Sequence, residues 1–289
     1  MLQKLKNRIS QFRKKRSEER QYAWWLKVWT NVSLQDSINN KPRPEKRLLR
    51  IMGNGNSLKQ VVDNMSNDCD YMVLNSYVLH DSYKILKPRY YVLADPGFFT
   101  GVSERTTLSL KKIFEETDWQ MTLFVPWEHT KNIKLESTKF VQVEYVNQSN
   151  YVGPERYRHY LYEHNLAMPN VNNVLASAIY LAIYMGYKEV ELYGVEHSWL
   201  RDVYVNDNNE VCLKDTHFYD KGVVKDMVFK SNDGGRNLKY HEVVKTYMEY
   251  FPAYWELRDL AEEHGCHILN MSPNSYIDAF ERGVKNDDR

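Results

Sequence analysis

The stretch RLLRIMGNGNSLKQV, Arg47–Val61, decides the fold of this 289-residue chain. Its apolar run Leu48–Met52 predicts a buried strand, and a helical pattern over Leu58–Met65 follows at once. The Gly-Asn-Gly-Asn-Ser turn at 53–57 joins the two. A glycine turn at a helix N-terminus offers backbone N–H groups to a phosphate. We therefore expect the first strand, turn and helix of a nucleotide-binding domain.

One common phosphate motif is matched poorly and another is excluded. Leu58 stands where a dinucleotide-binding turn has its third glycine, which permits close packing of helix on strand. No Gly-Lys-Ser or Gly-Lys-Thr follows, which excludes a P-loop. The backbone of Gly53 and Gly55 and the side chains of Asn54 and Ser57 then suit a phosphate or the ribose of a mononucleotide. A glycine turn that only connects strand and helix is the structural alternative.

Outward from this stretch, apolar runs alternate with helical patterns. Further strands are expected at Tyr71–Asn75, Tyr90–Ala94, Met121–Val125, Phe140–Tyr145, Glu189–Tyr193 and His267–Asn270, and helices at Ser103–Glu116, Asn172–Met185 and Leu238–His264, the last with a break near Pro252. This alternation predicts an α/β fold, Rossmann-like, with a mostly parallel sheet and helices on both faces. Ligands of such sheets bind beyond the carboxyl ends of the strands.

The same pattern predicts how the chain is organised. Residues 1–46 form a basic, tryptophan-rich extension and linker, and residues 47–289 form a single nucleotide-binding domain. Within that domain, the polar stretch at about 199–236 is too long for an ordinary connection and predicts a lid. It contains the alternating sequence DVYVNDNNEVCL at 202–213, which predicts a small hairpin.

Composition excludes several classes of protein. A hydrophobic content of 43% and a charged content of 27% are typical of a soluble globular protein. The formal charge is only +1, yet the first 20 residues carry eight basic and two acidic side chains, a net of +6. The remainder is slightly acidic, which argues against nucleic acid as a partner. Three widely spaced cysteines fit a reducing cytoplasm, and no apolar run approaches the ~18 residues of a membrane-spanning helix.

The N-terminal segment predicts a basic amphipathic helix. Apolar residues recur at helical spacing among lysines and arginines, at Leu2, Leu5, Ile9 and Phe12. Three tryptophans follow, at Trp24, Trp25 and Trp29. Cations beside tryptophans suit the surface of an anionic membrane. Residues 1–29 are therefore expected to hold the protein peripherally on the inner membrane. The alternative is a solvated helix whose tryptophans pack on the main domain.

Five blocks of sequence, in order, resemble known families. GNGNSLKQ at 53–60, NDCDYMVLNSYVL at 67–79 and YYVLADPGFF at 90–99 resemble the start of bacterial CMP-sialic-acid-dependent sialyltransferases of the Cst type. AIYLAIYMGYKEVELYGVEHSW at 178–199 and HILNMSPNSYIDAFE at 267–281 match their helix–strand unit and terminal Ser/Cys-Pro-Asn-Ser segment. The blocks also resemble the MptE-like domain family. That family includes motility accessory factors, which glycosylate flagellin with nonulosonic acids, and an archaeal hydroxymethyl-dihydropterin diphosphokinase.

The resemblance implies a nucleotide site. By position, Asn54, Ser57 and Asn75 match the residues that hold the cytidine nucleotide in the sialyltransferases. The expected site also takes residues from the glycine turn, the start of the long helix and the end of the following strand: Gly53, Gly55, Asn172, Asn173, Glu196 and Ser198. A reaction of the sialyltransferase type requires no cofactor.

The chain departs from the sialyltransferase pattern at three places. Asp95 replaces an asparagine on the third strand, and a carboxylate repels phosphate unless a cation or proton intervenes. Asp95 therefore indicates either a magnesium-assisted site or a contact to sugar hydroxyls. The family's Arg-x-x-Ser at the start of the long helix is missing. The tyrosine that steadies the leaving phosphate aligns near Ser198 and is missing too, unless Tyr204 or Tyr219 substitutes for it. Transfer of sialic acid itself is therefore not implied.

Sugar transfer also needs a base, and histidine suits this task near neutral pH. His241 in NLKYHEVV matches the place of the sialyltransferase base, and His217 in KDTHFYD lies in the lid. His197, at a strand's carboxyl end, is placed to touch substrate or to cap the next helix. Asp68-Cys69-Asp70 imitates an Asp-x-Asp metal motif, but it precedes its strand and is interpreted as a turn.

Three hypotheses result. The first is a cytoplasmic glycosyltransferase of bacterial surface-glycan synthesis, acting at the inner membrane on a glycan or lipid-linked acceptor. Its donor would be a nucleotide-activated sugar, favoured to be a CMP-linked acidic sugar of the sialic-acid, nonulosonate or Kdo type. The second is an MptE-like 6-hydroxymethyl-dihydropterin diphosphokinase that uses ATP, magnesium and Asp95. The third is a non-catalytic, membrane-associated glycan-binding protein.

Overall fold

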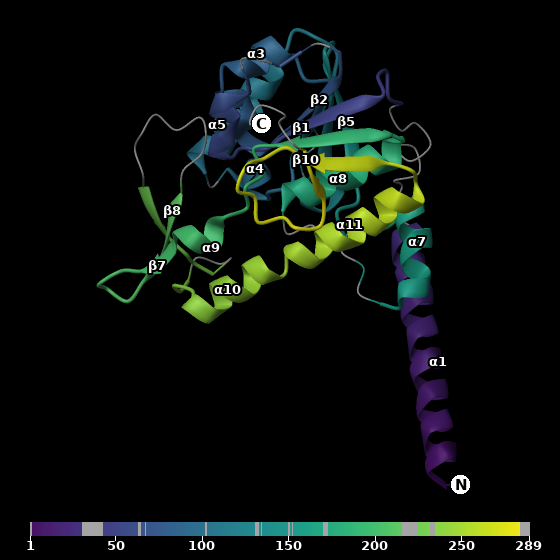
Figure 1. The fold of residues 1–289 in the computed structure, drawn as a ribbon. Coiled ribbons are helices and arrows are strands. Elements are labelled where there is room, and N and C mark those ends of the chain that lie inside the picture. Colours follow the sequence, from purple (N-terminus) through teal and green to yellow (C-terminus); the bar gives the residue numbers. More distant parts are fainter. Residues whose placement is uncertain are drawn as a thin grey trace, which may run out of the picture.

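A parallel sheet forms the centre of the molecule (Figure 1). The computed structural model describes residues 2–30, 43–62, 65–66, 68–101, 103–130, 133, 135–149, 151, 153–169, 173–215, 225–231 and 235–283. Eight strands lie in the order β11-β10-β6-β1-β2-β3-β4-β5, with bounds in that order of Glu281–Arg282, His267–Asn270, Glu189–Tyr193, Leu48–Met52, Asp70–Leu74, Tyr90–Val92, Met121–Pro126 and Val141–Val146. Every pairing in this sheet is parallel. The predicted Rossmann-like α/β fold is confirmed.

Helices cover both faces of the sheet, as expected. Successive side chains of a strand point to opposite faces, so β1 contributes to two cores. Leu49 and Ile51 join the core beneath α8 (Val174–Met185) and α11 (Phe251–Glu263). Met52 joins the core on the other face. That face is covered by short segments and one longer helix: η1 (Asn56–Gln60), η3 (Asn75–Leu79), α3 (Ser82–Leu86), α4 (Gly97–Thr100) and α5 (Glu104–Glu116).

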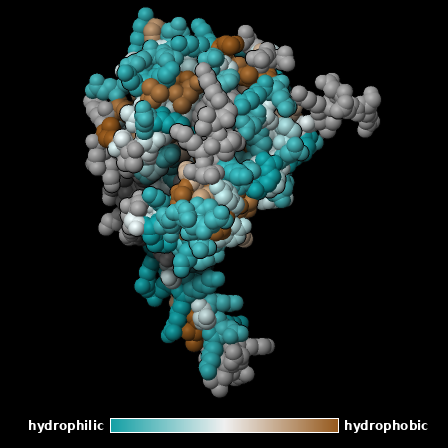
Figure 2. Space-filling model, turned by 90° about the vertical axis from the view of Figure 1, so that its left-hand side faces the viewer, coloured by the Kyte–Doolittle hydropathy of each residue, from teal (hydrophilic) through white to brown (hydrophobic). Residues whose placement is uncertain are grey.

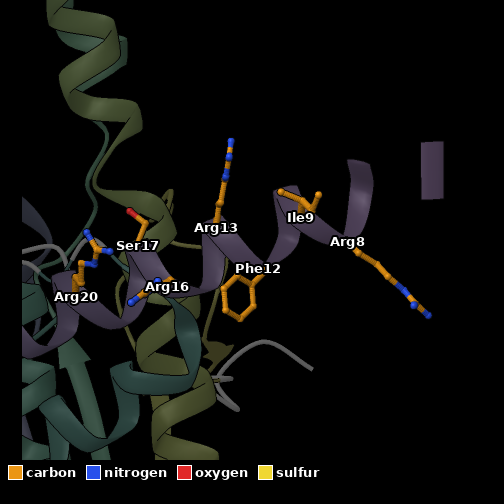
Figure 3. A pocket seen from close by; sticks show the side chains of 7 residues that line it. All are labelled: Arg8, Ile9, Phe12, Arg13, Arg16, Ser17 and Arg20. Carbon is orange, nitrogen blue, oxygen red and sulfur yellow. The ribbon is translucent and has the colours of Figure 1, made fainter. Parts of the chain in front are cut away.

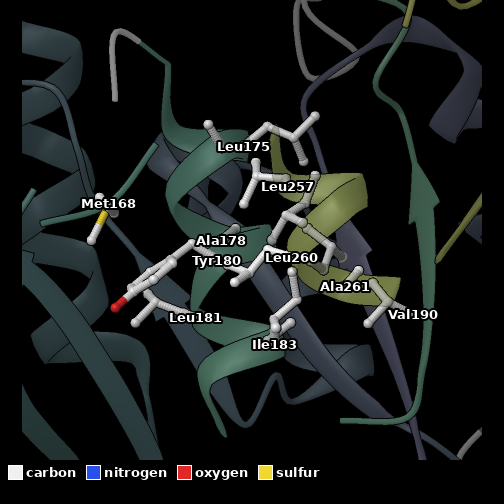
Figure 4. Close-up of a cluster of buried hydrophobic side chains, with 14 of the residues drawn as sticks. Met168, Leu175, Ala178, Tyr180, Leu181, Ile183, Val190, Leu257, Leu260 and Ala261 are labelled. Carbon is white, nitrogen blue, oxygen red and sulfur yellow. The ribbon is translucent and has the colours of Figure 1, made fainter. Parts of the chain in front are cut away.

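The helix α8 is the central buried helix. The side chain of Asn173 caps it by accepting hydrogen bonds from the backbone N–H groups of Leu175 and Ala176, at 2.9 and 3.2 Å. Gly186 ends it with a left-handed φ of 97°. Figure 4 shows apolar side chains of α8, such as Ile183, facing Leu260 of α11 across a dry contact. The helix expected at Asn172–Met185 is confirmed, with Asn173 as its N-cap.

The helix expected at Leu58–Met65 is wrong. The chain instead forms the five-residue 3-10 segment η1, closed by hydrogen bonds from Leu58 N to Gly55 O and from Val61 N to Leu58 O. The reason is tertiary: Leu58 is fully buried against the backbone of Gly194, where an added Cβ would lie 2.5 Å from the leucine's Cγ. This anchor tightens the turn, so a helix dipole does not build up here.

The predicted lid region forms a small sheet of its own. After α9 (Trp199–Asp202), the strands β7 (Val203–Val205), β8 (Val211–Asp215) and β9 (Lys225–Val228) pair antiparallel in that order. The predicted hairpin is therefore confirmed. Apolar side chains join this sheet to α10 (Tyr240–Met248), among them Val203, Leu213, Val243 and Tyr247. The break expected near Pro252 falls between α10 and α11.

The N-terminal helix α1 (Leu2–Thr30) projects from the domain (Figure 1). It is held at α7 (Glu155–Glu163), where Tyr22 stacks on Tyr157 with ring centroids 3.8 Å apart. Glu18 also pairs with Arg156 at 3.3 Å. Figure 2 shows the projection as largely hydrophilic surface. Averaged over its 29 residues α1 has no predominant apolar face, so the amphipathic pattern of its first turns does not extend along it.

A hollow on α1 is lined by side chains of that helix alone, namely Arg8, Ile9, Phe12, Arg13, Arg16, Ser17 and Arg20. Figure 3 shows Arg8 and Arg13 pointing away from the helix in different directions. The hollow is therefore open surface between neighbouring side chains and does not enclose a substrate. Across the described residues, none of the helices has the length and apolar content needed to cross a bilayer.

The Asp68-Cys69-Asp70 segment lies at the amino ends of the strands. This position agrees with its interpretation as a turn before a strand. Asp70 begins β2 and is only 5% exposed. Its Oδ2 accepts hydrogen bonds from the Tyr187 hydroxyl at 2.5 Å and from the Lys46 backbone N–H at 3.2 Å. A buried carboxylate needs such donors, because an unpaired one pays its full desolvation cost. The second aspartate of the motif thus has a structural role.

This contact makes a stability prediction. Tyr187→Phe is expected to lower the free energy of unfolding by about 1–3 kcal/mol, because Asp70 stays buried but loses its hydroxyl donor. Urea unfolding followed by circular dichroism measures the change. Tyr160→Phe, on the exposed surface of α7, is the matched control and should be nearly neutral. Equal effects of the two substitutions would contradict the structural role of the Tyr187 hydroxyl.

Candidate functional site

The strand order reverses between β1 and β6. The chain runs outward from β1 through β2, β3, β4 and β5, and then returns to β6 on the other side of β1. In open α/β sheets, ligands bind at such a switch point, beyond the carboxyl ends of the strands. The loop after β1 contains the glycine turn, and the loop after β6 contains Gly194 to Ser198. This edge is the candidate site.

The glycines of the turn allow these two loops to cross in close contact. Gly53 N donates to Tyr193 O at 2.7 Å, and Gly55 N donates to Gly194 O at 2.9 Å. A Cβ added to Gly53 would overlap the carbonyl oxygen of Gly194 and lie 2.9 Å from Val195 Cγ1. The first glycine is therefore required by backbone packing, whichever ligand binds.

The backbone N–H groups of the turn are not free for a phosphate. Ser57 N donates to Glu196 Oε1 at 2.8 Å, and the Glu196 carboxylate lies where a Cβ of Gly55 would be. A carboxylate occupies the position that we expected for a phosphate, and its charge repels one. Together with the shortness of η1, this contact disfavours a phosphate at the Ser57 N–H, and a contact of the turn with a nucleoside stays a prediction. The turn instead fixes Glu196 at the carboxyl edge.

Asn54 and Asn75 meet beside the glycine turn. Asn54 Nδ2 donates to the carbonyl oxygen of Leu74, the last residue of β2, at 3.1 Å. Asn75 follows with a left-handed φ of 49°, and its carbonyl oxygen accepts from the Tyr91 hydroxyl. Both Oδ1 atoms are buried and have no hydrogen-bond partner within the described part of the chain. The two amides thus share one edge and have unused acceptors.

Asp95 lies on the outer side of this edge. Its Oδ1 accepts from Gly97 N at 2.7 Å at the start of α4, and its side chain is exposed. Within the described ranges, no group of three or more His, Cys, Asp or Glu side chains is placed to hold a metal ion. The structure therefore leaves Asp95 available to solvent or ligand, and it links no second carboxylate to it.

A hydrogen-bonded chain of three side chains lines the other wall of the site. The Tyr254 hydroxyl on α11 lies 3.1 Å from Asn173 Oδ1 and 2.9 Å from His197 Nδ1. Asn173 Nδ2 is buried without a partner among the described residues. Desolvation lowers the pKa of His197 to about 3 and raises the pKa of Tyr254 well above its ordinary value. Both groups are therefore neutral near pH 7.

The terminal Ser-Pro-Asn-Ser segment holds the loop after β6. Val195 N donates to Ser272 Oγ at 2.9 Å, and Ser275 Oγ donates to Val195 O at 2.7 Å. Arg282 in turn donates to the carbonyl oxygen of Ser275. These serines, like Tyr254, were missed as site residues. The resemblance of the block was the only signal for the serines, and no sequence pattern pointed to Tyr254.

Four expected site residues remain. Ser198 is partly buried, and its carbonyl oxygen accepts from Arg201 N at the start of α9. His241 is exposed in the first turn of α10, about 9 Å along the helix axis from Tyr247. Arg236 and the backbone N–H of Lys239 bind Glu242 beside it and lower the pKa of that carboxyl to about 2. Asn172 and His217 lie outside the described residues.

Comparison with known proteins gives a relationship of fold. No protein-family model matches the chain, and no curated protein sequence matches it. Among solved structures, the chain is similar to the sialyltransferase CstII from Campylobacter jejuni, solved in complex with a substrate analogue, cytidine-5'-monophosphate. The identity is 15%, the match covers 83% of this chain and 86% of that chain, and the TM-score is 0.41. This similarity concerns the fold alone. The proposed function therefore rests on the residues of the site.

Proposed function

We propose that the chain is a glycosyltransferase that binds a nucleotide-activated sugar at the carboxyl edge of β1, β2 and β6. Three unpartnered buried amide atoms carry the proposal: Asn54 Oδ1, Asn75 Oδ1 and Asn173 Nδ2. Buried polar atoms nearly always have partners, and leaving one unpaired costs about 1–3 kcal/mol. The three atoms come from three segments that reach the carboxyl edge of the sheet. They support the proposal that a polar ligand binds there and supplies the missing hydrogen bonds.

The orientation of two of these amides is fixed by their other contacts. Asn54 Nδ2 is committed to Leu74 O, so its oxygen must be the free atom. Asn173 Oδ1 accepts two backbone N–H groups of α8, so its nitrogen must be the free atom. The site thus offers both an acceptor and a donor in defined places. Such a mixed pattern suits a nucleoside, which carries donors and acceptors on its base and hydroxyls on its ribose.

Glu196 supports the placement of the ribose in this proposal. Acidic side chains at the carboxyl edge of α/β sheets bind ribose hydroxyls. Ser57 N holds Oε1 of Glu196, which leaves Oε2, beside Gly55, to accept from a hydroxyl. The phosphate then lies on the far side of the nucleoside from this carboxylate. We favour a CMP-linked acidic sugar of the sialic-acid, nonulosonate or Kdo type as donor because of the ordered sequence blocks.

For the chemical step, we propose His241 as the base that takes the proton of the acceptor hydroxyl. Its exposure at the start of α10 keeps it accessible to an acceptor. His217 is the second proposed catalytic residue. Asp95, exposed beyond β3, would contact sugar hydroxyls, or hold magnesium if the reaction requires one. The sugar is transferred by direct displacement at its anomeric carbon, and the nucleotide departs with the bonding electrons of the broken C–O bond.

The proposed acceptor is a glycan or a lipid-linked glycan at the inner membrane. Phe12 is 66% exposed and Ile9 is 44% exposed on a helix that is otherwise strongly basic. Each Lys or Arg near an anionic lipid surface contributes about 1 kcal/mol of binding. This supports a peripheral, cytoplasmic association through residues 1–29, in which α1 brings the domain to its acceptor.

Thermal stability with added nucleotides tests the proposed site. CMP at 100 times its dissociation constant is expected to stabilise the protein by about 2.7 kcal/mol, which raises Tm by about 5 °C in a chain of this size. Asn54→Ala should abolish the shift, and Asn56→Ala, two residues away on the exposed side of the turn, should retain it. The measurement is made with magnesium and with EDTA.

Other outcomes point to different functions. A shift with ATP that requires magnesium, and none with CMP, would favour a diphosphokinase of the MptE type. The absence of a shift with any nucleotide or nucleotide sugar would contradict the proposed site and favour a non-catalytic glycan-binding protein.

A further inference from the structure

We infer that His197 binds the ligand through a neutral Nε2 that accepts a hydrogen bond, and that Tyr254 and Asn173 fix the ring in the tautomer that makes this possible. The inference rests on the proposed nucleotide site and adds a specificity-determining residue to it. The hydrogen donor is an N–H or O–H group of the bound nucleotide. His197 is thus a binding group, and the proton acceptor of the reaction is sought elsewhere.

The tautomer follows from counting protons along the chain of side chains. Asn173 Oδ1 can only accept, and it already takes two backbone N–H groups, so the Tyr254 hydroxyl must donate its one proton there. The Tyr254 oxygen is then left as an acceptor towards His197 Nδ1 at 2.9 Å. Nδ1 must therefore carry the ring proton. A neutral imidazole with the proton on Nδ1 has its lone pair on Nε2.

The ring is also held in place mechanically. Trp199 packs over it with ring centroids 4.2 Å apart, and the Tyr254 ring lies 5.5 Å away at a different angle. The backbone of His197 has a left-handed φ of 48°, a conformation that costs energy in a residue with a side chain. Among the described residues, none binds Nε2. The ring at the end of β6 is therefore held in place, with Nδ1 hydrogen-bonded to Tyr254 and Nε2 unused. This arrangement suits a ligand that donates a hydrogen bond to Nε2.

The same surroundings explain why a neutral ring is useful there. The carboxylate of Glu196 precedes His197 and is held at the edge by Ser57 N. A protonated His197 would pair with that carboxylate and could not accept a hydrogen bond. Burial keeps the ring uncharged, so it can accept from the amino group of a cytosine or from a ribose hydroxyl.

Nitrogen-15 NMR of the histidine rings tests the inference, with CMP as the probe and His197→Phe to assign the resonances. The free protein should show His197 with an unprotonated Nε2 and a protonated Nδ1 from pH 8 to pH 5. CMP should shift the Nε2 resonance. Tyr254→Phe should give mixed tautomers and weaken CMP binding about tenfold, the effect of one hydrogen bond. Tyr250→Phe, which packs on Trp199 from the same region, should change neither.

Two further nucleotides identify the donor. If the ring reads the cytosine amino group, wild type should prefer CMP to UMP, and His197→Phe should lose that preference. If the ring reads the ribose, the same loss should appear between CMP and deoxy-CMP. A proton on Nε2, or a ring that becomes charged near pH 6, overturns the inference. So does CMP that binds without shifting the ring resonance, although the proposed function then stands. If no nucleotide binds wild type, the proposed function fails and this inference fails with it.

Discussion

His241→Ala is expected to lower kcat for sugar transfer by roughly 10²–10⁴-fold, the usual contribution of a general base. Affinity for CMP should stay within a factor of about two, because His241 lies on α10 and the nucleotide is held at the sheet edge. The measurement is CMP release from a CMP-linked sugar that stabilises the protein, with and without a glycan acceptor. A loss in kcat with unchanged nucleotide affinity identifies a residue that acts in the transition state.

His217→Ala is the companion variant for this experiment. If His217 is instead the base, its substitution should produce the large loss in kcat and His241→Ala should be nearly silent. A control for the helix itself is Lys245→Ala, on the exposed face of α10 and one turn beyond His241. Full activity in both histidine variants, together with intact CMP binding, would rule out both as the base and leave the site as a nucleotide-binding module.

Gly53→Ala is expected to lower the free energy of unfolding by about 3 kcal/mol or more, because a Cβ there would overlap a backbone carbonyl that cannot rotate away. The shift needed to relieve the overlap also breaks the hydrogen bond from Gly53 N to Tyr193 O, which joins β1 to the end of β6. Urea unfolding measures the loss, and CMP binding should be lost in the same variant because Glu196 is displaced.

Gly101→Ala is the matched control. Gly101 has a left-handed φ of 69°, and no atom lies within 4 Å of an added Cβ. Its substitution therefore costs only backbone strain, about 1–2 kcal/mol. If Gly53→Ala were no more costly than Gly101→Ala, the loops after β1 and β6 would not cross as closely as described.

Local sequence patterns predicted the strands and long helices well. Glu189–Tyr193 and His267–Asn270 were predicted with the bounds that the structure has, because their buried residues alternate with more exposed ones between polar turns. Asn173 and Gly186 marked the ends of α8, because capping depends on side-chain chemistry within a few residues. The two-residue edge strand β11 was missed, since so short a segment carries no period.

The candidate site was predicted only in part. Strand order along the chain placed Asn54 and Asn75 at neighbouring carboxyl ends, and the structure brings them to one edge. The contact of Glu196 with the Ser57 N–H was not predicted, because these residues are 139 apart in sequence. Tyr254 contacts Asn173 and His197 across separations of 81 and 57 residues. No window of sequence contains such pairs.

The sequence by itself determined most of the strands and longer helices and the parallel α/β class, and it predicted the edge of the sheet at which a ligand would bind. Only the tertiary structure decided which groups meet at that edge: a carboxylate on the glycine turn, a neutral histidine tied to a tyrosine, and three amide atoms without partners. The physical reason is range. Propensity, capping and periodicity act over a few residues, whereas β6 pairs with β1 across about 140 residues, and that pairing brings the glycine turn to Glu196.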